Sequence, residues 1–344
     1  MTHPSIQYEF EHRPEIGESI EIFPGIRWLR MPLPFMLGHI NLWLLEDDDH
    51  WTIVDTGIYT PATRDHWESV LSEQLAGKPV NRVLVTHLHP DHVGCAGWLC
   101  ERFDAPLWMS REEYLLCRVL VADTGKEVPI EAIRFYAAAG FPETALERYE
   151  KTFGRFGSLV APMPQSYHRL FDGMKFRIGE NLWRVIVGQG HSVEHACLFC
   201  EQLNVLISGD QILPTISSNV SVYPTEPNAN PLDDWLSTLR MLADVLPADV
   251  LVLPAHGKPF RGAAIRLNEL IAEHLDGLEK LKALCSEPIR AIDAFPVLFK
   301  SVINDNNLIM ATGESIAHLH YLLELGEITS RTDQAGTRWY ELAK

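Results

Sequence analysis

The six residues from His87 to His92 constrain this 344-residue chain more than any other stretch. They place three imidazoles and one carboxylate in the sequence His-Leu-His-Pro-Asp-His, directly after the apolar run 82–85. That run is too short and too rich in β-branched residues for a helix, so it predicts a buried strand. The strand therefore ends in a loop of metal-ligating side chains.

The spacing within the loop predicts two neighbouring metal positions. His87 and His89 lie two residues apart, and side chains two apart on an extended backbone share a face. Asp91 and His92 follow Pro90, which turns the chain, so they address a second point nearby. Four such groups crowded together without a cation would repel one another or lose their hydration uncompensated.

The composition is that of a soluble globular enzyme, with 46% hydrophobic and 22% charged residues. The length suffices for one large domain, alone or with a small appendage. The net charge of −17 opposes general nucleic-acid binding, which requires a basic face.

We expect a cytoplasmic protein. Residues 1–7 lack the basic and apolar regions of a signal peptide, and no apolar run is long enough for a membrane span. The six cysteines show no disulfide framework. Cys197 and Cys200 lie three apart in a strand-like run, where they face opposite ways and are expected to be buried thiols. This cysteine usage is typical of a reducing compartment.

The pattern of the first 110 residues alternates strands and helices around strand ends. Strands are expected at 19–23, 26–31, 39–45, 51–54, 82–85 and 105–109, and helices at 61–75 and 94–103.

A helical insertion follows over about 110–165. Ser110 and Glu113 have the spacing of a capping box, and helices are expected at 114–121, 130–139 and 142–153. The insertion is either an edge cover or a lid or pocket wall over the metal site, and long insertions are often functional. The lid would be formed by the aromatic residues Tyr114, Phe135, Tyr136, Phe141, Phe153 and Phe156.

Three later strand-like runs end in further candidate ligands. The runs are 183–187, 205–208 and 249–253, and they precede Gly190-His191-Ser192, Gly209-Asp210 and Ala255-His256-Gly257. The order of these elements, together with Asp55-Thr56-Gly57 and the 87–92 loop, resembles the metallo-β-lactamase fold superfamily over about 20–262. The resemblance is to its dinuclear hydrolase branch, which includes glyoxalase II. It implies an αββα four-layer sandwich with metals at one rim.

The resemblance also implies a ligand set. One ion would be held by His87, His89 and His191, the other by Asp91, His92 and His256, with Asp210 bridging both. Imidazole and carboxylate suit zinc above all, and also iron or manganese, so two divalent ions are expected. A dinuclear site lowers the pKa of its water towards about 7, which makes hydroxide available to attack a carbonyl or phosphorus centre.

Other polar residues receive supporting roles. Asp91 is expected to orient the nucleophile as well as bind metal, and Asp55 to order the ligand loop through hydrogen bonds. His195 is either a ligand or pocket residue, or a hydrogen-bonded support. Structural or surface positions are expected for the histidines that are not part of any ligand-like motif in the sequence, which are His66, His168, His274, His318 and His320.

We divide the chain into a catalytic domain, 1–262, and a C-terminal domain, 263–344. The C-terminal part has an expected helix at 263–284, one at 289–299 interrupted by Pro296, one at 306–325, and a hairpin of 327–331 with 337–342. This order resembles a winged helix. Residues 281–344 hold six Lys/Arg against eight Asp/Glu, the wrong balance for phosphate contacts. A structural cap or homodimer contact is therefore favoured over nucleic-acid binding.

The expected function is hydrolysis of a small-molecule ester or thioester, with the insertion selecting the acyl group. Two alternatives remain, an endoribonuclease acting on single-stranded RNA and a non-catalytic metal-binding regulatory protein. β-Lactam hydrolysis is disfavoured, because the secreted dinuclear enzymes of that type carry a cysteine where this chain has Asp210.

Overall fold

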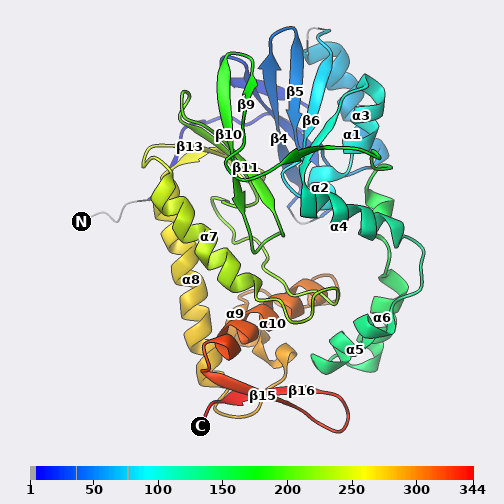
Figure 1. Cartoon of the computed structure of the whole chain (residues 1–344), viewed down its shortest axis with the longest axis vertical. Helices are drawn as coiled ribbons and strands as arrows, with labels where there is room; N and C mark the ends of the chain where they lie inside the picture. Colours follow the sequence, from blue (N-terminus) through cyan, green and yellow to red (C-terminus); the bar gives the residue numbers. More distant parts are fainter. Residues whose placement is uncertain (1–4, 36, 76) are drawn as a thin grey trace.

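The computed structural model describes residues 5–35, 37–75 and 77–344. Within them, two seven-stranded mixed sheets form the centre of the molecule (Figure 1). The first sheet has the strand order β2 (Ser19–Phe23), β3 (Ile26–Pro32), β4 (His39–Asp47), β5 (His50–Val54), β6 (Val80–Leu84), β7 (Leu107–Ser110) and β8 (His168–Leu170). Its pairs are antiparallel up to β5 and parallel from β5 to β8.

The second sheet is built mainly from the later half of the chain. Its order is β1 (Gln7–Tyr8), β14 (Phe260–Arg261), β13 (Leu251–Pro254), β12 (Val205–Gly209), β11 (His195–Cys200), β10 (Asn181–Gly188) and β9 (Lys175–Ile178). All neighbours are antiparallel except the parallel pair β12 and β13. Strands β1 and β14 were not predicted, because each is two residues long and is too short to show an alternation of apolar and polar side chains.

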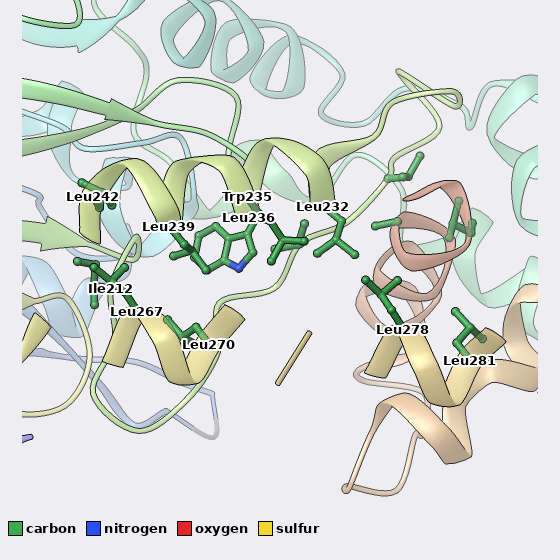
Figure 2. Close-up of a cluster of buried hydrophobic side chains, with 14 of the residues drawn as sticks. Ile212, Leu232, Trp235, Leu236, Leu239, Leu242, Leu267, Leu270, Leu278 and Leu281 are labelled. Carbon is green, nitrogen blue, oxygen red and sulfur yellow. The ribbon is translucent and has the colours of Figure 1, made fainter. Parts of the chain in front are cut away.

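The layers follow the predicted order helix, sheet, sheet, helix. Apolar side chains from both sheets meet between them, among them Trp43, Trp183 and Leu253. The outer face of the first sheet is covered by α1 (Pro61–Ser69), the π-helical turn η1 (Val70–Gln74) and α3 (Ala96–Phe103). The outer face of the second is covered by α7 (Pro231–Val245) and α8 (Ala263–Leu284), whose leucines interdigitate around Trp235 (Figure 2).

The helical insertion consists of α4 (Arg111–Ala122), α5 (Ile130–Ala138), α6 (Glu143–Thr152) and the 3-10 turn η2 (Phe156–Leu159). Its aromatic residues mostly pack into apolar clusters, so the prediction that they form a lid is wrong, whereas a role of the insertion as a pocket wall stays a prediction. Tyr114 packs in the core of the first sheet. Tyr136 and Phe141 form a cluster with Ile292 and Leu308 of the C-terminal segment.

The C-terminal segment after α8 contains the 3-10 turn η3 (Ala291–Ala294), α9 (Phe295–Leu298), α10 (Leu308–Glu324) and a hairpin of β15 (Ile328–Thr332) with β16 (Arg338–Leu342). Pro296 was predicted to interrupt a helix. It lies instead in the first turn of α9, where a missing backbone N–H costs nothing. Residues of α10 such as Leu319 share one apolar cluster with α7 and α8. The domain boundary after Gly262 stays a prediction.

The six cysteines are free and buried. Cys197 lies in the cluster under α7 and α8, and Cys200 lies between the sheets, so they face opposite sides of β11 as predicted. No helix among the described residues has the length and apolar character needed to cross a membrane.

Candidate metal centre

The candidate ligands gather at one rim of the sandwich, where strands of both sheets end. The loop after β6 continues into the short helix α2 (Pro90–Val93), and β10, β12 and β13 deliver the other ligands. Two backbone hydrogen bonds join the sheets there. The Ala196 N–H donates to Thr86 O at 2.8 Å, and the Asn41 N–H donates to Ala255 O at 2.7 Å. Segments more than 100 residues apart in the chain are thereby held side by side.

The seven candidate ligands form two groups, within each of which the ligand atoms all lie within 4.8 Å of one another. The groups are His87, His89, His191 and Asp210, and Asp91, His92 and His256. Asp210 contacts both. Its Oδ2 lies 3.4 Å from His191 Nε2 and 3.5 Å from His92 Nε2, and its Oδ1 lies 3.5 Å from His256 Nε2. The structure therefore brings all seven predicted residues together.

Hydrogen bonds orient the imidazoles. Four rings use Nδ1 for a partner in the protein: His87 with Thr86 Oγ1 at 3.0 Å, His92 with Asp55 at 2.8 Å, His191 with Asn219 O at 2.7 Å, and His256 with His39 O at 3.0 Å. The Nε2 atoms of His92, His191 and His256 are left for the site without another partner, and that of His87 faces His89. His89 is the exception, since its Nδ1 lies 2.8 Å from His87 Nε2. Such partners fix both tautomer and ring orientation.

The donor set fits a divalent cation. Nε2 of His92, His191 and His256 and Oδ1 of Asp210 are buried and have no hydrogen-bond partner. Leaving a buried polar atom unsatisfied costs about 1–3 kcal/mol, so these four atoms require an explanation. Ligands at 2.0–2.2 Å from a tetrahedral zinc lie about 3.3–3.6 Å from one another. The contacts of Asp210 with the three rings, at 3.4–3.5 Å, match that spacing.

The charges of the site also favour a cation. Burial lowers the pKa of His87 well below its usual value and that of His89 to about 3, so both candidate ligands are neutral rings. Burial also opposes protonation of His92, but its pKa is raised well above the usual value by the carboxylates of Asp55, Asp210 and Asp91. The same carboxylates that favour a proton at this point would also favour a metal ion.

Asp55 supports the ligand loop from the end of β5. Its Oδ1 accepts the Thr86 N–H at 2.8 Å, and its Oδ2 accepts Nδ1–H of His92 at 2.8 Å and the Thr86 hydroxyl at 2.9 Å. Its φ of +60° lies in the left-handed region, which aspartate tolerates better than most residues. The Asp55 carboxylate thus holds both the candidate ligand His92 and Thr86, which follows the end of β6.

His195 lies beneath the site and outside both ligand groups. Its Nε2 accepts the backbone N–H of Asp210 at 3.1 Å, so the ring supports the turn that carries that carboxylate. A Cβ at Gly209 would lie 2.5 Å from the same Nε2, and Gly209 has a φ of +50°. Glycine is therefore required there for the ring to reach the backbone.

Glu113 is a supporting residue that the sequence reading missed. It was assigned to a capping box, but Ser110 makes no side-chain cap to α4. The fully buried Glu113 instead accepts N–H groups of Leu88 and Glu194, both at 2.9 Å, and the Ser192 hydroxyl. It thereby joins the loop of the first histidines to the loop of His191. Its burial raises its pKa.

Asn41 was missed as well. Its Nδ2 donates to Pro254 O at 2.9 Å and to Gly257 O at 2.8 Å, which holds the turn carrying His256. Its Oδ1 accepts the indole N–H of Trp28 at 2.8 Å. A polar residue in the otherwise apolar middle of β4 was the available signal, because a buried amide must find partners.

Comparison with known proteins shows which family has this architecture. A family model described as the metallo-beta-lactamase superfamily matches residues 36–256, and one described as the metallo-beta-lactamase-like C-terminal domain matches residues 278–343. A crystal structure of a beta-lactamase domain protein from Burkholderia ambifaria is 42% identical, with a TM-score of 0.90 and 98% of each chain covered. A metallo-beta-lactamase family protein from Thermus thermophilus is 30% identical, with a TM-score of 0.79, covering 94% of this chain and 100% of the other.

Two curated relatives carry functional names. The probable metallo-hydrolase YqjP of Bacillus subtilis (strain 168) is 25% identical over 311 residues, 88% of this chain and 93% of its own length. The atrochrysone carboxyl ACP thioesterase of Aspergillus fumigatus is 26% identical over 236 residues, 68% of this chain but 41% of the fungal protein. The superfamily model alone spans well over half of the residues, so the chain belongs to the metallo-beta-lactamase superfamily.

Proposed function

We propose that the protein is a dinuclear metal-dependent hydrolase of a small ester or thioester, similar to glyoxalase II. The observation that carries the proposal is the position of Asp210, whose two oxygens lie within 3.5 Å of ligand nitrogens from both groups. A carboxylate so placed can be shared by two divalent ions, and zinc suits the donor set best.

When bound, the two ions supply a hydroxide near neutral pH and stabilise the developing oxyanion. The chain supplies a proton acceptor beside them. The side chain of Asp91 is 17% exposed, so it faces the open side of the site. Burial raises the pKa of Asp91, but His92 and His256 lower it overall, so the carboxylate is ionised. Asp91 is therefore placed to accept the proton of the attacking water and return it to the leaving group.

A thioester is the preferred substrate class because one relative is named a thioesterase and its match extends over two thirds of this chain. We propose that the helical insertion and the loop 211–230 shape the acyl pocket.

We also retain as proposals a winged-helix-like C-terminal cap, a homodimer, and a cytoplasmic location, the last supported by six free, buried thiols.

The experiment is a parallel assay of metal-loaded protein on a thioester and ester panel and on labelled single-stranded RNA, each with and without chelator. Chelator-sensitive turnover of a thioester or ester with intact RNA is expected. RNA cleavage without thioester turnover would overturn the proposal in favour of a nuclease, and no turnover of any substrate would favour a regulatory metal-binding protein.

Asp210→Asn tests the shared ligand. The variant should bind fewer than two ions per chain and lose about a hundredfold or more in rate, because it removes charge from both positions. Two tightly bound ions and an unchanged rate would show that Asp210 bridges nothing.

A further inference from the structure

The loop that follows the Asp210 turn docks on the first half of α10, in the C-terminal segment. The Val222 N–H donates to Gly313 O at 3.1 Å. The Ser221 hydroxyl donates to Asn219 Oδ1 at 2.6 Å, and Asn219 Nδ2 donates to Glu314 Oε2 at 2.7 Å. Loop and helix are therefore joined by backbone and side-chain hydrogen bonds.

The packing at this contact leaves no room for a side chain on the helix. A Cβ added at Gly313 would lie 2.7 Å from Ser221 Cβ and 2.9 Å from Val222 O. Both distances are far below van der Waals contact, so any other residue at 313 would push the loop away from α10.

The same loop holds two candidate metal ligands. Nδ1–H of His191 donates to Asn219 O at 2.7 Å, which leaves Nε2 with the lone pair that faces the site. The Ser218 hydroxyl donates to the backbone carbonyl of Asp210. A displacement of the loop would therefore disturb both the His191 ring and the backbone turn that carries Asp210.

A buried chain of hydrogen bonds fixes α10 in turn. The indole N–H of Trp235 on α7 donates to His274 Nε2 at 3.1 Å, so His274 must carry its proton on Nδ1. That proton is donated to His318 Nε2 at 3.2 Å, and Nδ1–H of His318 donates to Glu314 O at 2.8 Å. The backbone at Glu314 is thereby tied to α7 and α8, which cover the second sheet.

We propose that α10 is a positioning element of the metal centre: through Gly313 and Glu314 it fixes Asn219, whose carbonyl sets the tautomer and orientation of His191. The C-terminal segment thus contributes to metal binding. The inference concerns the ligands alone and holds whichever substrate the site cleaves.

The test compares Glu314→Ala with Glu324→Ala. Both glutamates lie on α10 and accept a hydrogen bond from an asparagine amide, but Glu324 binds Asn230, which holds no candidate ligand. Zinc affinity is measured by competition with a chromogenic chelator, and ligand geometry by the visible absorption of the cobalt-substituted protein. Glu314→Ala should bind zinc about 10–100-fold more weakly, with altered cobalt bands, as expected when the partner of a ligand is lost. Glu324→Ala should match the wild type.

Two further variants sharpen the result. Glu314→Gln keeps an acceptor for the Asn219 amide and should restore most of the affinity, whereas Gly313→Val should lower it as Glu314→Ala does. Unchanged zinc affinity and cobalt spectra in Glu314→Ala and Gly313→Val would overturn the proposal. Loss of the circular dichroism signal of Glu314→Ala would also overturn it, because Glu314 would then serve the fold and not the site.

Discussion

At the scale of single residues, one buried carboxylate couples two ligand loops. Glu113 accepts three hydrogen bonds, from Leu88, Ser192 and Glu194. The first partner belongs to the loop of His87 and His89, and the other two lie one and three residues after His191. The relative position of ligands from two sheets therefore depends on a residue that binds no metal itself.

Glu113→Ala should lower the free energy of unfolding by about 3 kcal/mol, because one buried and two partly buried donors lose their acceptor. The measurement is urea denaturation of metal-free protein at pH 7.5. Glu112→Ala, one residue earlier on the exposed face of α4, is the matched control and should change the free energy little. Equal effects of the two substitutions would contradict the role assigned to Glu113.

The difference between predicted and missed residues has a physical reason. His87, His89, Asp91 and His92 could be predicted as ligands because their spacing is local. The partners of Glu113 lie 25, 79 and 81 residues away, and its spacing from Ser110 is typical of a helix cap. Long-range supports of this kind leave no pattern in one sequence.

At the scale of elements, α7, α8 and α10 are joined by two neutral histidines. Burial lowers the pKa of His274 to about 3 and that of His318 to about 4. Each ring accepts one hydrogen bond and donates another, so protonating either would leave two donors facing each other.

The stability of the metal-free protein should therefore fall with acid. An unfolded histidine titrates near 6.5, so between pH 6.5 and about 4 the unfolded chain binds more protons than the folded one. The contribution of these histidines to the free energy of unfolding is complete above pH 6.5 and is lost as pH falls towards 4. For one histidine whose pKa in the folded state is near 4, the loss at pH 5 is about 2 kcal/mol. Urea denaturation at several pH values measures this slope.

A double substitution isolates the two rings from other titrating groups. His274→Gln with His318→Gln should reduce the slope between pH 6.5 and 5, since glutamine can both accept and donate without titrating, and the remaining slope should come from other buried histidines such as His87 and His89. His12→Gln, at an exposed position, should leave the wild-type slope intact. The assignment is wrong if the double variant keeps the full slope.

Periodicity predicted the helices well because each has a clear apolar face. The three helices of the insertion, 114–121, 130–139 and 142–153 by prediction, became α4, α5 and α6 with shifts of a few residues. What these helices pack against could not be predicted, since the cluster around Tyr136 includes Ile292 and Leu308, more than 150 residues further along.

At the scale of the whole molecule, the candidate ligands connect the two sheets. Four of them follow β6 of the first sheet, and three follow strands of the second. An ion bound between the groups would stabilise only the folded chain, because the unfolded chain does not hold these groups together.

Removal of metal should therefore destabilise the protein. Free metal at a thousandfold excess over its Kd adds about 4 kcal/mol to the free energy of unfolding, and a chelator should remove that increment. Urea denaturation with and without chelator measures it, with Asp210→Asn as the variant in which the difference should shrink. Superimposable wild-type curves would contradict metal binding at this rim.

The four-layer order could be predicted because the motifs at the strand ends resemble those of the metallo-β-lactamase superfamily, and that resemblance implies the fold. The contact between α10 and the loop of Asn219 could not, because it joins two segments whose own patterns are ordinary. The net charge of −17 remains the main argument from the whole sequence against a nucleic-acid substrate.

The contact between α10 and Asn219 also has a consequence for the nascent chain. The last ligand is His256, yet the helix that orients His191 reaches Glu314 only later in the sequence. At ordinary rates of synthesis, about 3–12 seconds separate the two on the ribosome. A chain released in that interval would carry all seven ligands and still lack the helix that sets one of them for the ion.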